Sequence, residues 1–320
     1  MVYYYSMPKE KPLYANPYLQ NTLTAEDGHQ INMTVWNDVT AMPKGIVLIV
    51  HTMSECAERY KDFAAKLNEA GYIAIGLDLR GHGVAAIQNL GKTDKNHFDK
   101  SKLDVMSLAK SVRIEYTGLP LYLFAHGYGS FLAQALIKDG QLGLSKLSGV
   151  ILSGTTVAKD IRFWLARKRS YFKATRKSGN KEGHTFGRIF RGHDFIFREG
   201  INGWLSSDCE AVGEFNTGSL TGFLCDNNFF RSYFVGLKKL AKAKFDTTAS
   251  KDMPIFIIGG SKDCLSWFGR GAKKLCQAYS NKGFAKVECK IYEGVRHDLL
   301  FEKNRDEVVG DIIAMLNNNA

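Results

Sequence analysis

The stretch "FAHGYGSF", residues 124–131, contains the turn on which the rest of the chain can be placed. The apolar run ending at residue 125 predicts a buried strand, and the apolar spacing over residues 129–140 predicts a helix. The turn between them has the outline G-x-S-x-G, a sharp bend that presents a reactive serine. Gly127 stands at the position of that serine. The stretch therefore predicts a strand-turn-helix unit that lacks its reactive side chain.

The same alternation of strands and helices extends along the chain in both directions. Short β-branched or apolar runs predict strands at residues 30–36, 45–50, 72–78, 121–125, 147–154, 253–260 and 287–294. Amphipathic spacing predicts helices at residues 61–72, 102–116, 129–140 and 305–318. Such alternation is typical of a mostly parallel, doubly wound sheet.

Composition excludes several classes of protein. Hydrophobic residues make up 45% of the 320 residues, which favours a folded domain with a sizeable core. No apolar run approaches the roughly 18 residues of a membrane span, and the first residues lack signal-peptide features, so we expect a cytoplasmic protein. Six scattered cysteines form no C-x-x-C pair, and no G-x-G-x-x-G follows the first buried strand. We therefore expect neither metal nor cofactor.

Polar residues with catalytic potential follow three of the predicted strands. The turn at residues 126–129 follows one strand, Asp263 follows another and His297 follows the last. The carboxyl ends of parallel strands carry the ligand-binding loops of such sheets. In chain order these positions run nucleophile, acid, histidine, which is the order in α/β-hydrolases.

Three longer segments resemble one branch of that fold family. Residues 47–83, "VLIVHTMSECAERYKDFAAKLNEAGYIAIGLDLRGHG", are similar to the HGM-x-EH-x-x-RY block and D-x-RGHG turn of the monoacylglycerol lipase and lysophospholipase family, a serine aminopeptidase-like group. Residues 119–134, "LPLYLFAHGYGSFLAQ", resemble its LPLFLFGHSYGSFLAQ stretch, and residues 291–312 resemble the block around its histidine. The resemblance implies the α/β-hydrolase fold with a helical cap insertion.

The resemblance also implies roles for five positions. Asp263 and His297 match the acid and the base of a catalytic triad. The backbone N–H groups of Met53 and Tyr128 match the oxyanion hole, and Gly127 matches the nucleophile position without its serine. Three further departures lie nearby, where the family has Gly, Gly and His: Ala125, Thr52 and Cys56.

By this resemblance the chain is a serine-hydrolase-family lipid esterase acting on monoacylglycerols or lysophospholipids. Because Gly127 has no hydroxyl, we expect it to be inactive or strongly impaired, since a triad contributes about 10⁶-fold. The alternative is a natural pseudoenzyme that binds lipid or acyl ligands without turnover. A substitution introduced into an active hydrolase and a natural loss both fit the sequence. In either case, Gly127→Ser is expected to restore esterase activity.

Other candidates near the turn are expected to be structural. Ser130 lies nearly one helical turn from the nucleophile position, and Cys264 lies on the loop of the acid. His51 and His82 are expected to orient loops. Asp298 is the weaker candidate for the acid, and we expect it to tolerate replacement by Asn.

The predicted cap carries most of the positive charge. We expect the hydrolase core in residues 1–155 and 241–320 and the cap in residues 156–240. Residues 159–199 contain twelve Lys/Arg against four Asp/Glu, an excess of eight charges out of a net +11, interleaved with eight aromatic residues. This pattern fits peripheral contact with an anionic membrane, and it fits a solvated basic face as well. The expected partner in the pocket is a lipid or small acyl-ester substrate. Without a nucleic-acid-binding motif we expect no nucleic-acid partner, and the sequence indicates no oligomeric state.

Overall fold

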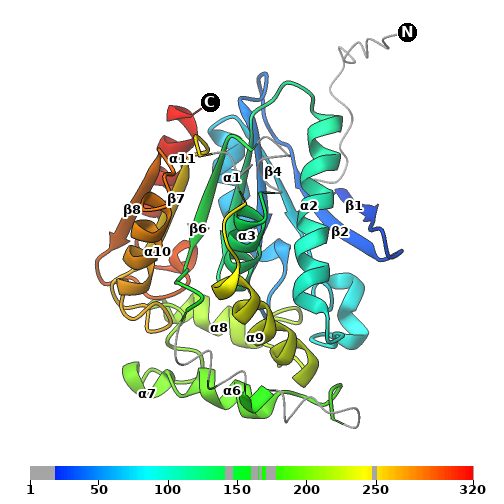
Figure 1. Ribbon diagram of the computed structural model, residues 1–320, viewed down its shortest axis with the longest axis vertical. Coiled ribbons are helices and arrows are strands. Elements are labelled where there is room, and N and C mark those ends of the chain that lie inside the picture. Colours follow the sequence, from blue (N-terminus) through cyan, green and yellow to red (C-terminus); the bar gives the residue numbers. More distant parts are fainter. Residues whose placement is uncertain are drawn as a thin grey trace.

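An eight-stranded sheet forms the centre of the protein in the computed structural model, which describes residues 19–140, 147–159, 165, 168–170, 178–246 and 251–319 (Figure 1). The strand order is β1-β2-β4-β3-β5-β6-β7-β8. The strands are β1 Leu19–Thr24, β2 Gln30–Trp36, β3 Gly45–Val50, β4 Tyr72–Leu77, β5 Leu121–His126, β6 Gly149–Ser153, β7 Ile255–Gly260 and β8 Val287–Tyr292. Pairing is antiparallel between β1, β2 and β4 and parallel from β4 to β8. The predicted mostly parallel sheet of an α/β-hydrolase fold is confirmed.

The central strands are buried along their whole length. Every residue of β3, β4, β5, β6 and β7 is buried. Strands covered on both faces need apolar side chains on both sides, which explains why they appear as continuous rather than alternating runs. The register pairs Val50 with Ala125, and His126 with Ser153. The loops that follow β3, β5 and β6 therefore begin at one edge of the sheet.

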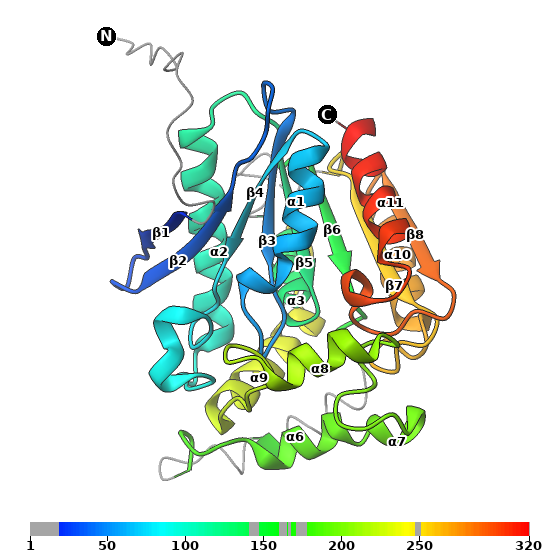
Figure 2. The same ribbon diagram turned by 180° about the vertical axis from the view of Figure 1, so that it is seen from behind.

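Helices cover both faces of the sheet and bury a separate core on each. The helices α2 (His97–Glu115), α3 (Tyr128–Lys138) and α10 (Arg270–Ser280) share one face, as Figure 1 shows. The helices α1 (Lys61–Glu69) and α11 (Arg305–Asn318) cover the other, seen in Figure 2. Helices on both faces give the doubly wound arrangement that the sequence predicts.

Four described helices lie between β6 and β7 in the chain and below the carboxyl edge of the sheet in space (Figures 1 and 2). They are α6 His184–Arg191, α7 Asp194–Phe197, α8 Cys209–Thr217 and α9 Asn227–Lys242. We propose that they form the cap, with α9 extending to Lys242, two residues beyond the expected boundary. None of the helices in the described ranges combines the length and hydropathy required for a membrane span.

Aspartate caps fix the start of the two cap helices nearest the sheet. The Asp226 carboxylate accepts hydrogen bonds from the backbone N–H of Phe229 at 2.8 Å and of Thr93 at 3.0 Å. Asp208 caps α8 in the same way. Each cap satisfies N–H groups that have no partner within the helix. Because Thr93 belongs to the core, Asp226 also joins α9 to it.

Candidate active site

The turn after β5 has the strained backbone of a nucleophile elbow without its side chain. Gly127 has φ 50° and ψ −114°, a conformation that L-residues rarely adopt. Its N–H donates to Ser153 O at 3.0 Å. Ser130 Oγ donates to Gly127 O at 2.6 Å, so Ser130 supports the turn and has the structural role expected of it. A Cβ on Gly129 would lie 2.6 Å from Val50 O, which explains the second glycine of the motif.

Asp263 and His297 meet at the carboxyl edge of the sheet. Nδ1 of His297 lies 3.2 Å from Oδ1 of Asp263, and both side chains are buried. Leu265 N–H donates to the same carboxylate oxygen at 2.9 Å. Burial alone would lower the pKa of the His297 imidazole, but Asp263 together with the charges of Asp298 and Glu55 more than offsets it, so the pKa is raised. For the Asp263 carboxyl, burial raises the pKa and His297 lowers it, with a net downward shift.

The histidine is aimed at the empty nucleophile position. Nε2 of His297 lies 3.3 Å from the point at which a Cβ on Gly127 would stand. A base that receives a proton from a nucleophile must lie within hydrogen-bond reach of it. The acid, the base and the nucleophile position predicted from the sequence are therefore together in space, although the last carries no reacting atom.

Asp298 is held by partners other than Nδ1 of the base. Its Oδ1 lies 3.1 Å from Nε2 of His126, and its Oδ2 lies 2.8 Å from the guanidinium of Arg59. Burial raises the pKa of this carboxyl, but Arg59 and His126 lower it further, so the net shift is downward. His126, His297 and Asp298 are the three-residue group of the described chain that could hold a metal ion. Asp298 already pairs with the Arg59 cation, which it shares with Glu55, and we assign no metal there.

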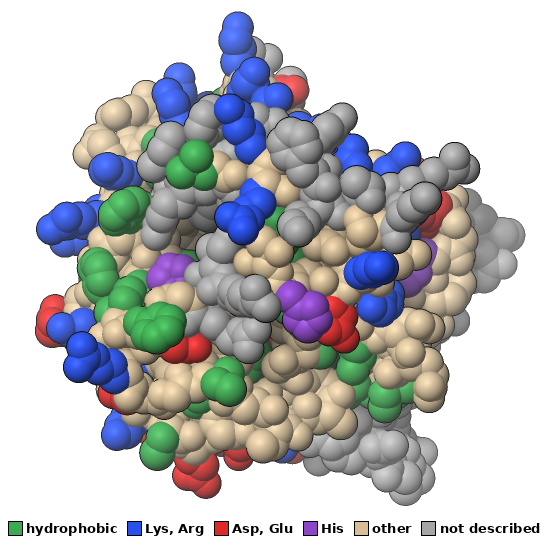
Figure 3. Space-filling model, turned by 90° about the horizontal axis from the view of Figure 1, so that it is seen from below, with side chains coloured by type: hydrophobic (Ala, Val, Ile, Leu, Met, Phe, Trp, Pro, Cys, Tyr) green, Lys and Arg blue, Asp and Glu red, His purple; other side chains and the backbone are tan. Residues whose placement is uncertain are grey.

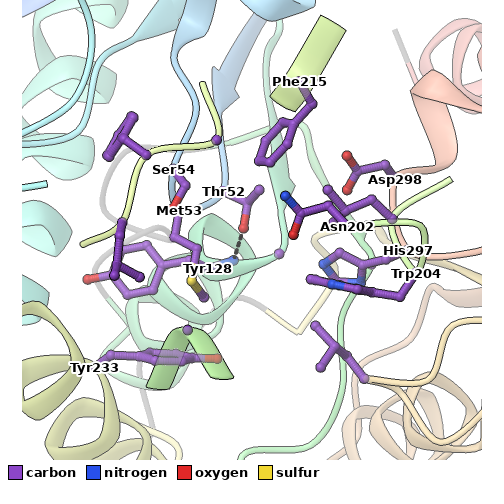
Figure 4. Close-up of a pocket in the computed structure, with 18 of the residues that line it drawn as sticks. Thr52, Met53, Ser54, Tyr128, Asn202, Trp204, Phe215, Tyr233, His297 and Asp298 are labelled. Atoms are coloured by element: carbon purple, nitrogen blue, oxygen red, sulfur yellow. Dashed lines mark hydrogen bonds between the residues drawn. The ribbon is translucent and has the colours of Figure 1, made fainter. Parts of the chain in front are cut away.

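The loop after β3 differs most from the expected oxyanion hole. Thr52 Oγ1 accepts a hydrogen bond from Tyr128 N at 2.9 Å, drawn as a dashed line in Figure 4. Thr52 N in turn donates to the buried Glu55 carboxylate at 2.9 Å. Met53 N has no hydrogen-bond partner among the described residues. Of the two N–H groups expected to bind an oxyanion, one is thus occupied by a side chain of the protein itself, which sequence reasoning did not anticipate.

Two histidines hold this loop in place, as expected. Leu79 N donates to His51 Nε2 at 3.0 Å, and Ser54 N donates to His82 Nε2 at 3.3 Å. Cys264 is buried and is not among the residues that line the adjoining cavity. None of these groups supplies a substitute nucleophile.

A cavity of about 330 Å³ opens in front of His297 and the elbow. Its apolar lining comes mainly from α3 and the segment between β6 and β7, including Phe131, Phe215, Phe223, Leu224, Phe230 and Tyr233. The indole of Trp204 lies against the imidazole of His297, with ring centroids 5.3 Å apart (Figure 4). Among the apolar residues of the proposed cap, Phe223, Leu224 and Phe230 line the cavity. Phe229 is buried, Leu165 is exposed, and Phe163 and Trp164 lie outside the described residues.

Arg296 ties the cap segment to the loop of the histidine, a feature that sequence reasoning missed. Its guanidinium is buried and pairs with the Glu199 carboxylate at 2.7 and 2.8 Å and with Ser206 O at 2.9 Å. One residue beyond the base, Asp298 N donates to Leu205 O at 2.8 Å. The sequence feature that points to this anchor is the cationic Arg296 directly before His297. His297 is therefore positioned by the segment between β6 and β7 as well as by Asp263.

The face of the cap seen from below carries basic and hydrophobic side chains together (Figure 3). Lys168 and Arg169 are exposed, as are Phe195, Ile196 and Ile201. Three further basic residues of the segment 159–199 lie outside the described residues: Arg167, Arg176 and Lys177.

Comparison with known proteins points in the same direction as the geometry. The family described as "Serine aminopeptidase, S33" matches residues 41–304. The chain is 27% identical over 163 residues to monoglyceride lipase of Homo sapiens, covering 50% of this chain and 51% of that protein. It is 26% identical over 138 residues to monoacylglycerol lipase of Mycolicibacterium smegmatis, covering 43% and 47%. The matches thus span about half the length of these relatives.

Solved structures share the whole fold at low identity. A thermostable carboxyl esterase from Bacillus coagulans in complex with glycerol matches with a TM-score of 0.83 at 23% identity, covering 95% of this chain and 99% of that one. A soluble variant of monoglyceride lipase from Saccharomyces cerevisiae, in complex with a substrate analogue, matches with a TM-score of 0.70 at 18% identity, covering 98% of both chains. At such identities the likeness is one of fold.

Proposed function

Because the chain belongs to the serine aminopeptidase (S33) family of lipase- and esterase-like α/β-hydrolases, we propose that its pocket takes lipid esters with a single acyl chain. Monoacylglycerols and lysophospholipids are the substrate class we propose. With Gly127 in place, the protein binds these ligands and does not turn them over through an acyl-enzyme.

One observation carries this proposal: an apolar cavity converges on an intact His297–Asp263 pair at a position with no nucleophile. A volume of about 330 Å³ is within the usual range of small-molecule pockets, roughly 300–1,000 Å³. Each buried methylene of an acyl chain contributes about 0.8 kcal/mol, so a long chain can supply most of the binding free energy. The similarity to a monoglyceride lipase and a monoacylglycerol lipase supports an ester of this kind as the ligand.

The missing hydroxyl decides between binding and turnover. Acyl transfer in such a site begins when a serine oxygen attacks the ester carbonyl while the histidine takes its proton. Gly127 offers no such oxygen. Pockets that retain only a dyad and oxyanion donors still accelerate hydrolysis by roughly 10³–10⁴-fold over water. We therefore expect residual hydrolysis far below that of the active relatives.

Calorimetry with a long-chain monoacylglycerol, followed by an assay of released fatty acid, tests the proposal. We expect one saturable site per chain and release of fatty acid about 10⁶-fold slower than with an intact triad. Leu224→Trp should fill the pocket and weaken binding, whereas Ile114→Trp, at a surface site 78% exposed, should not. Absence of binding by the folded parent, or hydrolysis at the rate of a complete triad, would contradict the proposal.

We further propose that the basic cap meets an anionic membrane from which such lipids are drawn. Exposed Lys168 and Arg169 and the exposed apolar side chains of Phe195 and Ile196 support it. Each Lys or Arg near an anionic surface contributes about 1 kcal/mol, and salt screens this contribution. Co-sedimentation with phosphatidylserine vesicles should fall at high salt and in the Lys168→Gln/Arg169→Gln variant; salt-independent or absent binding would refute this role.

A further inference from the structure

We propose that Thr52 occupies both the space of the missing nucleophile side chain and the Tyr128 N–H, the oxyanion donor that follows it. A side chain at position 127 then conflicts with threonine at position 52, so the effects of substitutions at the two positions are coupled. The Thr52 hydroxyl is the group that donates a hydrogen bond to the ester carbonyl of a bound ligand. The identity of that ligand rests on the proposed function, whereas the coupling between the two positions does not.

The steric part of the proposal follows from the position of Thr52. A Cβ placed on Gly127 would overlap Oγ1 of Thr52 and would lie only 2.7 Å from its Cβ. Rotation about χ1 can move Oγ1 away, but it cannot move Cβ, which is fixed by the backbone. Any side chain at position 127 therefore requires a shift of one of the two loops. Interiors are close-packed, so such a shift has a cost.

The electrostatic part follows from the hydrogen bonds of the same side chain. The Tyr128 N–H, an oxyanion donor by resemblance, already donates to Thr52 Oγ1 at 2.9 Å. A threonine hydroxyl has one proton to donate as well as lone pairs to accept. Thr52 lines the cavity, and its proton has no acceptor among the described residues. The Thr52 hydroxyl thus accepts a hydrogen bond from the Tyr128 N–H and can donate its own proton to a ligand carbonyl, next to the N–H of Met53.

Thr52 is a binding residue in this arrangement rather than a replacement nucleophile. Its oxygen is held by the Tyr128 N–H, and no hydrogen bond joins it to His297 in the described structure. A nucleophile of this type requires its base within hydrogen-bond reach. Acylation of Thr52 in the parent protein would therefore count against the proposal.

Reaction with an alkyl fluorophosphonate tests the coupling without any lipid ligand. In this reaction the oxygen of a serine at position 127 bonds to phosphorus, fluoride leaves and the serine proton passes to His297. We compare Gly127→Ser with the double variants Thr52→Gly/Gly127→Ser and Thr52→Ala/Gly127→Ser, and we check folding by thermal melting. We expect Thr52→Gly/Gly127→Ser to react about 100-fold faster than Gly127→Ser, because an atom misplaced by about 1 Å costs that much. The Thr52→Ala/Gly127→Ser control keeps a Cβ at position 52 and should stay slow.

Each result of this comparison bears on the proposal. Failure of Gly127→Ser to fold, together with a folded and reactive Thr52→Gly/Gly127→Ser variant, supports it. Equal reactivity of Gly127→Ser and Thr52→Gly/Gly127→Ser, or labelling of Thr52 in the parent, overturns it. Because no lipid takes part, failure here is separate from failure of the proposed function.

Affinity for two ligands of matched chain length tests the role of the hydroxyl: a long-chain alkyl methyl ketone, which has a carbonyl, and the corresponding ether, which has none. Thr52→Val should weaken ketone binding about tenfold and ether binding little, since only the ketone loses a hydrogen bond. Thr52→Ser should retain both affinities. Equal effects of Thr52→Val on the two ligands, or no effect on either, would overturn the binding role.

Discussion

The loop of the histidine and the loop of the nucleophile lie on the same edge of the sheet but differ in what they retain. Around His297 the expected acid is in place, and Arg296 and Asp298 tie the loop to the cap and to the core. Around Gly127 the backbone is that of an elbow, but Thr52 fills the space of its side chain. The histidine loop thus retains the contacts expected of a triad, whereas the loop of the nucleophile position does not.

The largest expected effect comes from removing the base once a nucleophile is restored. In the Thr52→Gly/Gly127→Ser background, His297→Ala should lower kcat for a short-chain aryl ester by about 10⁶-fold, since serine and histidine act as a unit. Hydrolysis kinetics measure this effect. His29→Ala is the matched control, because His29 lies in the turn between β1 and β2 and does not line the cavity. Undiminished activity without His297 would show that the histidine half is not catalytic.

Asp263→Asn in the same background should lower kcat somewhat less than His297→Ala does. An amide at this position favours the wrong histidine tautomer, and the corresponding change in a serine protease costs about 10⁴-fold in kcat. The loss should appear in kcat rather than in KM, because Asp263 is fully buried and does not line the cavity. A change confined to KM would place Asp263 in ligand binding instead.

Asp298→Asn should lower stability rather than merely be tolerated. The carboxylate is buried and lies 2.8 Å from the nearly buried Arg59 guanidinium, which also pairs with the Glu55 carboxylate. The substitution therefore removes a charge-assisted hydrogen bond but leaves Arg59 paired with Glu55. Urea denaturation should show a loss of about 1.5–3 kcal/mol in the free energy of unfolding, the usual contribution of hydrogen bonds to a charged group.

An exposed ion pair supplies the control for that experiment. Lys66 Nζ lies 2.8 Å from Glu69 Oε2 on the surface. Glu69→Gln should therefore change the free energy of unfolding by no more than about 1 kcal/mol. Similar effects of the two substitutions would mean that the histidine loop is not anchored through Asp298.

The smallest expected effect is the pH dependence of the stability that the His297–Asp263 pair contributes. The folded-state pKa of His297 is raised. Its contribution to stability is therefore fully present below its unfolded-state pKa of about 6.5 and is lost as the pH rises through the folded-state value. The difference in unfolding free energy between the parent and His297→Gln should thus shrink from pH 6 to pH 9. A difference that grows with pH would mean that the pKa is lowered.

Much of the fold and the positions of the site residues could be predicted from the sequence. Continuous apolar runs such as residues 45–50 mark strands buried on both faces, and the residues after them lie together because parallel strands end at one edge. The same rule brings Asp263 and His297 to Gly127 from the order of the strands alone. The resemblance then supplied the oxyanion positions Met53 and Tyr128.

Contacts between distant side chains could not be predicted in this way. Thr52 and Gly127 are both visible as departures from a family pattern, but their overlap depends on how two loops approach each other. The sequence therefore predicted that Gly127→Ser alone restores activity, and the overlap leads us to expect that Thr52→Gly is needed as well. The prediction that Asp298 tolerates Asn is revised for the same reason, since its partner Arg59 lies 239 residues away.

A double-mutant cycle in stability tests most directly whether Thr52 occupies the space of the missing side chain. The free energy of unfolding is measured for the parent, Gly127→Ser, Thr52→Gly and the double variant. With Thr52 present, Gly127→Ser should be destabilising by about 1–3 kcal/mol beyond any backbone strain, because the site is overpacked. In the Thr52→Gly background that excess should vanish, giving a coupling of about 1–3 kcal/mol. Additive effects, within about 0.5 kcal/mol, would contradict the account.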